Sequence, residues 1–391
     1  MFLEELHLIN FKNYRNSSFS FNPGLNFIYG ENGNGKTNIL ESISLLCYSK
    51  SFLMNSDSDC VMHGENRYDI SGGFENASGS KSRVKISYNR DTFAKELYYG
   101  NEKVSKLNEF IGSFPLVVLS PYDLKLTSGT PQDRRRNFDL LISQVSRVYL
   151  SDLRDYNKII KQKNSLLREN VLSRRYQPME VRDMVTLWNS ELLELAVKII
   201  FRRLDFIEEF RKYVEECFNK IVGTRYIPVI TYESDIFEGT TDTRFDASEI
   251  RSRLKSLLDS RLDAEIKRGL SLSGPHRDNY IFSMNKDGTL FDMRTFASQG
   301  EHKTFVVSLK LSEFGYIKEN LQHTNIGDPV LLLDDVFSEL DKSRIAKISQ
   351  LITGFNQVFI TTTDIDHLEV LKLSFKETKA FNIINGTVQS I

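Results

Sequence analysis

The stretch Gly30-Glu31-Asn32-Gly33-Asn34-Gly35-Lys36-Thr37 has the pattern G-x-x-x-x-G-K-[ST] of a phosphate-binding loop. Its glycines let backbone N–H groups turn inward around phosphate oxygens, while the Lys36 ammonium reaches the β- and γ-phosphates and the Thr37 hydroxyl can ligate Mg²⁺. Residues 25–29 predict a buried strand before the loop, and residues 38–46 predict an amphipathic helix whose N-terminus points at the phosphates. A Gly- and Asn-rich surface turn would explain the glycines and asparagines, but it would not explain Lys-Thr at a helix start. The loop therefore predicts a site for a nucleoside triphosphate with Mg²⁺. The residues expected to contact the nucleotide here are Gly30, Glu31, Asn32, Gly33, Asn34, Gly35, Lys36, Thr37 and Asn38.

The composition restricts the class of protein. The chain has 391 residues, of which 40% are hydrophobic and 26% charged, as is typical of a globular protein with two or three subdomains. Its start lacks the pattern of a secretory signal, and no apolar run reaches membrane-spanning length. Three scattered cysteines without a C-x-x-C pair indicate a reducing compartment and argue against a zinc site. We therefore expect a cytoplasmic protein with no membrane segment. Because the net charge is only −1, DNA binding would require a local basic surface.

Periodicity indicates one nucleotide-binding lobe made from both ends of the chain, with a helical lobe inserted between them. The helical lobe contains two long periodic segments that are interrupted at residues 174–178. This lobe is too short to form a long coiled coil. The last third alternates between strand and helix, and this order predicts an open, mainly parallel sheet. The strands expected there are residues 280–284, 330–333 and 358–360, with helices at 301–317 and 343–352.

The expected fold is therefore α/β, with mixed β-sheets around the phosphate-loop helix, an inserted helical lobe and no long coiled coil. The predicted boundaries are residues 1–125 for the N-terminal part of the nucleotide lobe, 126–268 for the mostly helical insertion, and 269–391 for the C-terminal part.

The second half of a nucleotide site is predicted at the end of residues 330–335. This apolar strand ends in two carboxylates, and in P-loop proteins such a strand is expected beside the phosphate-loop strand. Asp334 would then meet the Mg²⁺ held by Thr37, and Asp335 would orient or deprotonate the attacking water. An Asp at a strand end can also serve as a simple helix N-cap, but the upstream loop favours the catalytic interpretation.

Two compatible interpretations fit the stretch that begins at Ser298. As local structure, Ser298 and Glu301 form a capping box at the start of a helix. As chemistry, the Ser298-Gln299-Gly300 turn offers free N–H groups and a hydroxyl to an anion, such as a γ-phosphate presented by another subunit.

With these motifs in place, the chain resembles the RecF family of bacterial recombination-repair ATPases of the ABC/SMC class, and the resemblance covers nearly the whole length. The most specific shared elements are Gly274-Pro275-His276-Arg277-Asp278 and Ser298-Gln299-Gly300, in this order and spacing. No chemistry for His276 or Arg277 follows from the residues themselves, since a Gly-Pro turn entering a strand explains the stretch equally well. The other matching stretches are residues 8–14, 30–43, 129–136 and 331–341.

The resemblance implies a slow ATP hydrolase with ATP and Mg²⁺ as cofactors. Lys36 and Thr37 would hold phosphate and Mg²⁺, with Asp334 as the second metal ligand and Asp335 serving the water. Ser298, Gln299 and Gly300 would complete the nucleotide site of a partner chain, and Asp341 would belong to a loop that crosses to it. The resemblance further implies an ATP-dependent homodimer that binds single-strand/double-strand DNA junctions without reading sequence. Such a dimer acts with RecR and RecO to help load a recombinase in repair and replication restart.

Three departures from the family pattern affect these expectations. Glu301 and His302 follow the Ser-Gln-Gly turn, and an acid facing a γ-phosphate is unfavourable unless it turns back into the capping box. Tyr122 stands where the family tends to carry an acid. Residues 361–364 replace the histidine that ABC transporters often have after the final strand, a histidine that RecF-like sequences often lack too.

The expected DNA contacts are basic side chains in the helical lobe, which would contact phosphates and position DNA without reading sequence. Charged helix faces are more often simply solvated, and the three arginines near the lobe junction could instead hold structure or sense nucleotide. The candidate residues are Arg134, Arg135, Arg136, Lys158, Lys161 and Lys163.

Other functions compete with the repair interpretation. An ATPase of a phage-defence or toxin system would use the same head, and a transporter subunit would require a membrane partner. A small-molecule kinase predicts an arginine-rich lid and no Ser-Gln-Gly turn. We favour an ATP-driven dimeric clamp.

Overall fold

The computed structural model describes residues 1–173, 176–223, 226–238, 245–339, 342–372 and 375–390. The chain divides into two compact units. The first comprises residues 1–124, 213–225 and 298–391, and the second comprises 125–212 and 226–297. In the described part of the chain, no helix combines the length and the apolar character needed to cross a membrane.

A six-stranded sheet in the first unit carries both halves of the predicted nucleotide site. Its strand order is β15-β14-β3-β13-β12-β8, and all neighbours except β14 and β15 run parallel. The residues of β8, β12 and β13 are buried throughout, as expected for a parallel sheet covered on both faces. The strands are β3 (Gly24–Tyr29), β8 (Leu116–Leu119), β12 (Val330–Asp334), β13 (Gln357–Thr362), β14 (Thr378–Ile384) and β15 (Thr387–Ser390).

This order corrects one sequence-based expectation. The acidic strand β12 does not lie beside the phosphate-loop strand β3, because β13 pairs with both of them and separates them. The end of β12 and the loop after β3 therefore approach each other across the end of β13.

A second, antiparallel sheet completes the N-terminal part of this unit, in the order β2-β1-β4-β5-β6-β7. Helix α1 (Lys36–Tyr48) contacts strands of both sheets, which explains why it is buried almost along its whole length. The strands of this sheet are β1 (Phe2–Phe11), β2 (Tyr14–Ser20), β4 (Arg67–Glu75), β5 (Lys81–Asn89), β6 (Ala94–Tyr99) and β7 (Glu102–Lys103).

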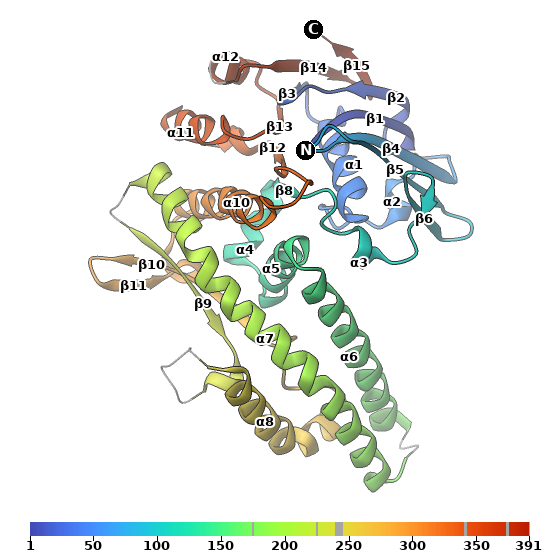
Figure 1. Ribbon diagram of the computed structural model, residues 1–391, viewed down its shortest axis with the longest axis vertical. Coiled ribbons are helices and arrows are strands. Elements are labelled where there is room, and N and C mark those ends of the chain that lie inside the picture. The colour runs from blue at the N-terminus through green and yellow to red at the C-terminus, as the bar shows by residue number, and fades with distance from the viewer. Residues whose placement is uncertain (174–175, 224–225, 239–244, 340–341, 373–374, 391) are drawn as a thin grey trace. The chain divides into compact units, whose positions relative to one another are not determined.

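The C-terminal helices cover the face of the parallel sheet opposite α1 (Figure 1). They are α10 (Gln299–Leu321), α11 (Lys342–Ile352) and α12 (Asp366–Lys372). Helix α10 packs against β8 and is buried over much of its length. The short elements of this unit are α2 (Asp57–Cys60), α3 (Leu107–Phe110), η1 (Pro121–Leu124) and η3 (Val336–Glu339).

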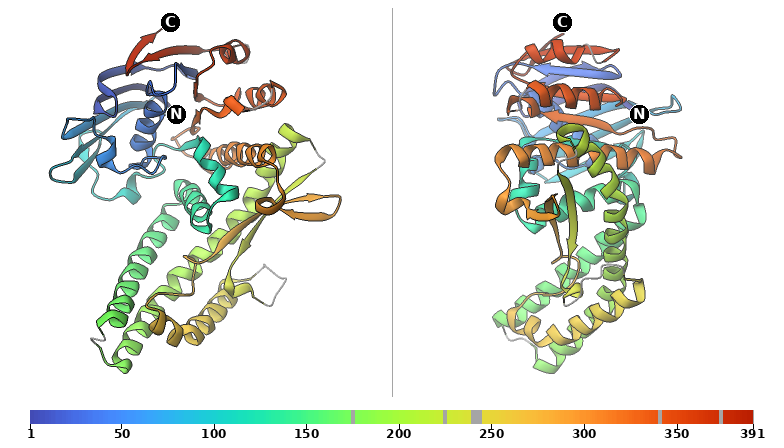
Figure 2. Two further views of the ribbon diagram at one scale, coloured as in Figure 1. Left: turned by 180° about the vertical axis from the view of Figure 1, so that it is seen from behind. Right: turned by 90° about the vertical axis from the view of Figure 1, so that its left-hand side faces the viewer.

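The second unit combines helices with the three-stranded antiparallel sheet β11-β10-β9. Its three long helices can be followed in Figure 2. Side chains of these helices form one buried cluster, made of Leu167, Val181, Val185 and Leu262. The long helices are α6 (Arg147–Ser173), α7 (Pro178–Val222), whose last turns belong to the first unit, and α8 (Ala247–Arg268). The remaining elements are α4 (Lys125–Ser128), α5 (Pro131–Val145), β9 (Ile227–Glu233), η2 (Asp235–Phe237), β10 (Asn279–Lys286), β11 (Thr289–Asp292) and α9 (Met293–Phe296).

Two further expectations change here. Strand β10, expected in the parallel sheet, pairs antiparallel with β9 and β11. The chain accordingly returns to the first unit at residue 298, and not at the predicted boundary of 268/269, while residues 213–225, which include the end of α7, also belong to that unit. Alternating strand and helix in sequence could not distinguish these pairings, because strand partners are chosen by long-range contacts.

Candidate nucleotide site

The phosphate loop connects β3 to α1 through glycines in conformations that other residues rarely adopt. Gly30 has φ +149°, and a Cβ there would collide with the Ile383 carbonyl oxygen. Gly35 is the N-cap of α1 with φ +102°, and a Cβ there would collide with the side chain of Asn13. The loop glycines are therefore required both by backbone conformation and by close packing.

Side chains from the turn after β1 and from the first residue of β2 form hydrogen bonds to the loop. The Asn13 amide donates to the Asn34 carbonyl at 2.8 Å, and the Tyr14 hydroxyl donates to the Gly35 carbonyl at 3.0 Å. Asn38 of α1 in turn donates to the Asn13 side-chain oxygen at 2.8 Å. The sequence motif did not identify Asn13 and Tyr14 as site residues, because their contacts depend on the packing of β1 and β2 beside the loop.

Lys36 is the first residue of α1, and its side chain binds the backbone of the loop. Its ammonium donates to the carbonyl oxygens of Gly30 at 2.8 Å and Glu31 at 2.9 Å. Burial lowers the pKa of Lys36, and the nearby carboxylates of Asp335 and Asp334 oppose that shift. A buried ammonium held by carbonyl dipoles is well placed to exchange these partners for phosphate oxygens.

Thr37 and Asp334 meet across the carboxyl edge of the sheet. The Thr37 hydroxyl donates to Asp334 Oδ1 at 2.8 Å, and the Thr361 hydroxyl donates to the same oxygen at 2.6 Å. Burial raises the pKa of Asp334, while the two hydroxyl donors and Lys36 act in the opposite direction. One hydroxyl and one carboxylate within hydrogen-bond distance form an all-oxygen donor set, and this set fits Mg²⁺, which prefers oxygen ligands.

Asp335, the residue after Asp334, has a strained backbone conformation with φ +49°. Its N–H donates to the Thr361 hydroxyl at 3.0 Å and to the Thr361 carbonyl at 3.1 Å. Thr361, at the end of β13, therefore links both acids, although its role had no sequence signal beyond its position after a buried strand.

The Ser298 turn is built as the capping box that the sequence predicted. Ser298 is the exposed N-cap of α10, and its hydroxyl accepts from the Glu301 N–H at 3.3 Å. The Glu301 carboxylate accepts from the Ser298 N–H and the Ser298 hydroxyl, each at 2.7 Å. The departure at Glu301 is thus accommodated, because its side chain bends back onto the turn. Gly300 lies close to the guanidinium of Arg344, because a Cβ added at Gly300 would be 3.5 Å from Nη1.

The expected DNA contacts separate into buried and exposed residues. Lys163 is fully buried, with its ammonium 2.6 Å from the Glu265 carboxylate, so this candidate is corrected to an internal ion-pair residue. Arg134 is also buried and donates to the backbone carbonyls of Leu126 and Gly129. The structure thus places these two cations inside the second unit.

The other candidates differ in exposure. Half-buried Arg135 donates to the Asp278 carbonyl. The exposed candidates are Arg136, Lys158 and Lys161. The last nucleotide-site candidate, Asp341, lies outside the described residues.

Buried polar contacts hold the Gly-Pro-His-Arg-Asp stretch in the second unit. Arg203 of α7 is buried, pairs with Asp139 at 2.9 Å and donates to the Pro275 carbonyl at 2.7 Å. Asp278 accepts from the Tyr232 hydroxyl, and burial raises the pKa of Asp278 to about 6. The turn into β10 is therefore held by buried polar contacts, in line with the structural interpretation of this stretch.

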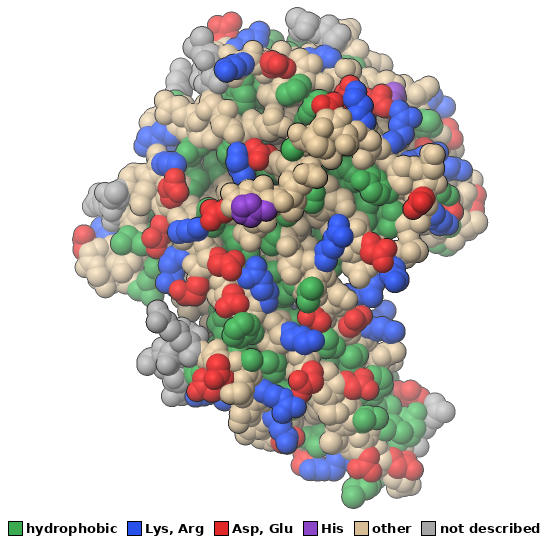
Figure 3. Space-filling model, in the orientation of Figure 1, with side chains coloured by type: hydrophobic (Ala, Val, Ile, Leu, Met, Phe, Trp, Pro, Cys, Tyr) green, Lys and Arg blue, Asp and Glu red, His purple; other side chains and the backbone are tan. Residues whose placement is uncertain are grey.

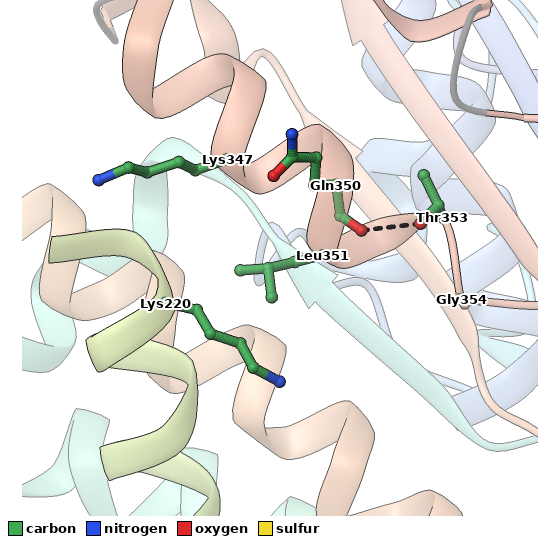
Figure 4. A pocket seen from close by; sticks show the side chains of 6 residues that line it. All are labelled: Lys220, Lys347, Gln350, Leu351, Thr353 and Gly354. Carbon is green, nitrogen blue, oxygen red and sulfur yellow. Dashed lines mark hydrogen bonds between the residues drawn. The ribbon is translucent and has the colours of Figure 1, made fainter. Parts of the chain in front are cut away.

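A pocket of about 460 Å³ lies between the end of α7 and α11 (Figure 4). Its lining includes Lys220 and Lys347, of which Lys347 donates to the Ile221 carbonyl at 2.8 Å. None of its lining residues belongs to the phosphate loop, the acidic strand or the Ser298 turn, so this pocket is not the nucleotide site.

Comparisons with known proteins agree with this architecture. The model of the RecF/RecN/SMC N terminal domain matches residues 2–382. The DNA replication and repair protein RecF of Chloroherpeton thalassium is 36% identical over 366 residues, which are 93% of this chain and 95% of the relative. A solved structure titled as the recombination mediator protein RecF-ATP in the RecFOR pathway matches with TM-score 0.85 at 29% identity, covering 100% of this chain and 99% of the other. An Smc head bound to the C-winged helix domain of ScpA shares the fold, with TM-score 0.57 at 13% identity and coverage of 100% and 97%.

The fold and the phosphate loop define a P-loop ATPase head of the ABC/SMC class. Within that class, the chain belongs to the RecF family.

Proposed function

We propose that this chain is a slow ATP hydrolase that binds DNA in recombinational repair and replication, acting in the cytoplasm as an ATP-dependent homodimer. The observation that carries the nucleotide assignment is the Thr37–Asp334 hydrogen bond at the carboxyl edge of the parallel sheet. It brings the phosphate loop and the acidic strand end into one site, at the edge where open α/β sheets bind ligands.

Lys36 would bind the β- and γ-phosphates of ATP by exchanging the carbonyl oxygens of Gly30 and Glu31 for phosphate oxygens. The backbone N–H groups of the loop, at the start of α1, would hold the remaining phosphate charge. Thr37 and Asp334 would hold Mg²⁺, which when bound supplies positive charge to the phosphates.

Asp335 would orient the attacking water. Its backbone is held by Thr361 through two hydrogen bonds, which restrict where the carboxylate can point. A positioned carboxylate that accepts a proton from water is the usual means of general-base assistance in hydrolysis.

Ser298 would complete the site of a second copy of the chain. The turn is exposed, and among the described residues the N–H groups of Gln299 and Gly300, at the start of a long helix, have no hydrogen-bond partner, a geometry that favours an anion. The γ-phosphate would then be shared between Lys36 of one protomer and Ser298 to Gly300 of the other. ATP binding would close the dimer and hydrolysis would open it.

The repair assignment is supported by the names of the similar proteins, which are DNA replication and repair proteins and a recombination mediator of the RecFOR pathway. By family likeness, the dimer would bind single-strand/double-strand junctions and act with RecR and RecO to load a recombinase on gapped DNA.

The experiment is sedimentation velocity of the hydrolysis-impaired variant Asp335→Asn with ATP, with ADP and without nucleotide. We expect a dimer with ATP and a monomer in the other two states. The matched control is Lys36→Ala/Asp335→Asn, which lacks the phosphate-binding ammonium and should remain monomeric with ATP. A variant that stays monomeric at saturating ATP would refute the shared site. ATP hydrolysis that gapped DNA fails to stimulate would count against the repair assignment.

A further inference from the structure

The five exposed cations of helix α6 lie on one face of that helix. They follow one another at steps of seven, four, three and seven residues, which at 3.6 residues per turn confines them to an arc of about 80°. All five are exposed, and we call them the basic stripe: Arg147, Arg154, Lys158, Lys161 and Arg168.

The opposite side of α6 faces the interior. Its buried residues recur at steps of seven, four, three and four, and Lys163 is one of them, paired with Glu265. The stripe therefore has a fixed direction, because burial of the other face determines which way these cations point. Among the acids of the helix, Asp152 lies near Lys198, whereas the helical spacing places Asp155 and Glu169 closer to the edge of the stripe.

Charge pairing in the stripe can be compared with that on the neighbouring helices. Some surface arginines of α7 and α8 are paired with acids: Arg182 with Asp263, and Arg251 with Glu194. Within the stripe, Arg154 contacts its neighbour Asp155 at 3.5 Å. For the other four stripe residues, no acidic partner occurs in the described part of the chain.

The face of the molecule in Figure 3 shows basic and acidic side chains interspersed, in keeping with the net charge of −1. The stripe differs from this mixed pattern, because it gathers five cations on one side of a helix. Mutual repulsion within the stripe is relieved most effectively by a polyanion.

We propose that the basic stripe of α6 binds the phosphate backbone of duplex DNA. This inference rests on the proposed function and specifies the surface that carries it. From Arg147 to Arg168 the helix rises about 32 Å, close to the roughly 34 Å of one duplex turn. The two aromatic residues of α6, Tyr149 and Tyr156, are buried, so the stripe offers no platform for stacking unpaired bases. Contacts to phosphate alone position DNA without reading its sequence.

The test is the salt dependence of DNA affinity for Lys158→Gln/Lys161→Gln, measured by fluorescence anisotropy with a 30-base-pair duplex and a 30-nucleotide single strand. The matched control is Lys255→Gln/Lys267→Gln, which removes two exposed lysines from α8. Two lost duplex contacts should lower the slope of log affinity against log salt by about 1.8. The control should leave this slope unchanged.

Each other outcome has a defined meaning. An equal decrease of the slope in the stripe variant and the control would show a general effect of charge and overturn the proposal. A stripe variant with an unchanged slope would also overturn it, although the protein would still bind DNA. A decrease seen only with the single strand would overturn the duplex assignment. Absence of DNA binding by the wild-type chain in every nucleotide state would refute the proposed function itself. Arg154→Gln/Arg168→Gln provides a second stripe variant, and unchanged unfolding in urea would confirm that each variant is folded.

Discussion

The Thr361 hydroxyl donates a 2.6 Å hydrogen bond to Asp334 and accepts another, at 3.0 Å, from the N–H of Asp335. One side chain of β13 therefore holds both acids that end β12. We expect Thr361→Val to lower the free energy of unfolding by about 1–3 kcal/mol, because buried polar partners lose their hydrogen bond. It should slow single-turnover ATP hydrolysis at least about tenfold while changing ATP affinity much less. Thr361→Ser keeps the hydroxyl and should retain most of the activity; equal damage by both variants would contradict a positioning role.

Substitution by alanine should have different effects at two glycines of the phosphate loop. Gly30→Ala combines φ +149° with a collision against the Ile383 carbonyl, so we expect it to abolish measurable ATP binding. Gly33 has φ +82° and open space around a Cβ, so Gly33→Ala should cost only about 1–2 kcal/mol of backbone strain. Isothermal titration with ATP and chemical unfolding of both variants would compare them. Similar effects would show that the packing against Ile383 does not matter.

The Ser298 turn can be tested without loss of its helix cap. Both Asp and Asn cap helices well, so Ser298→Asp and Ser298→Asn should leave the unfolding free energy within about 1 kcal/mol of wild type. The Asp variant adds a negative charge where the partner's γ-phosphate is expected, and we expect it to prevent ATP-dependent dimerisation while the Asn variant dimerises at least in part. Sedimentation in the Asp335→Asn background measures this. Dimerisation of both variants would place Ser298 away from the shared site.

Lys163 and Glu265 should behave as a buried ion pair. Lys163→Met leaves the Glu265 carboxylate buried without its cation, and we expect a loss of about 3–5 kcal/mol in the free energy of unfolding. Lys163→Met/Glu265→Leu should be closer to wild type than either single change, since both charges are then absent. Urea unfolding of the three variants forms a double-mutant cycle, and additive effects would contradict direct pairing.

Acid should destabilise the second unit through His276. Burial, with the charge of Arg277, lowers the pKa of His276 to about 3, and the Tyr156 hydroxyl lies 2.6 Å from its Nδ1. Between its usual value of 6.5 and about 3, the unfolded chain binds a proton that the folded chain does not. The stability contributed by neutral His276 is therefore complete above pH 6.5 and is lost as pH falls, at up to about 1.4 kcal/mol per pH unit. His276→Gln should flatten this dependence in unfolding measured from pH 7 to pH 4.

Asp278 should change the stability of the folded state with pH in the direction opposite to His276. Its pKa is raised from 3.8 to about 6, first by burial, so the folded chain holds a proton that the unfolded chain has lost. Between pH 6 and 3.8, acidification therefore stabilises the folded state through this group. Asp278→Asn removes that opposing contribution, and the variant should lose stability more steeply than wild type over the same range. A shallower profile would contradict the assignment.

The sequence alone determined the elements whose signals are local. The phosphate loop, the acidic end of β12 and the capping box of Ser298 and Glu301 each depend on residues a few positions apart, and the structure contains all three. The helix that the sequence predicts at residues 301–317 is likewise present, as part of α10. Local spacing is sufficient for these features because hydrogen bonds and side-chain contacts one turn apart form them.

Only the tertiary structure decided which distant segments meet. It inserted β13 between β3 and β12, so that Thr361 reaches both acids, and it set Asn13 against the phosphate loop. It paired β10 with β9 and β11, which moved the unit boundary to residue 298. It also buried Lys163 beside Glu265 while turning the other cations of α6 outward. These outcomes follow from strand pairing and helix packing between residues far apart in the chain, whose partners a one-dimensional pattern does not specify.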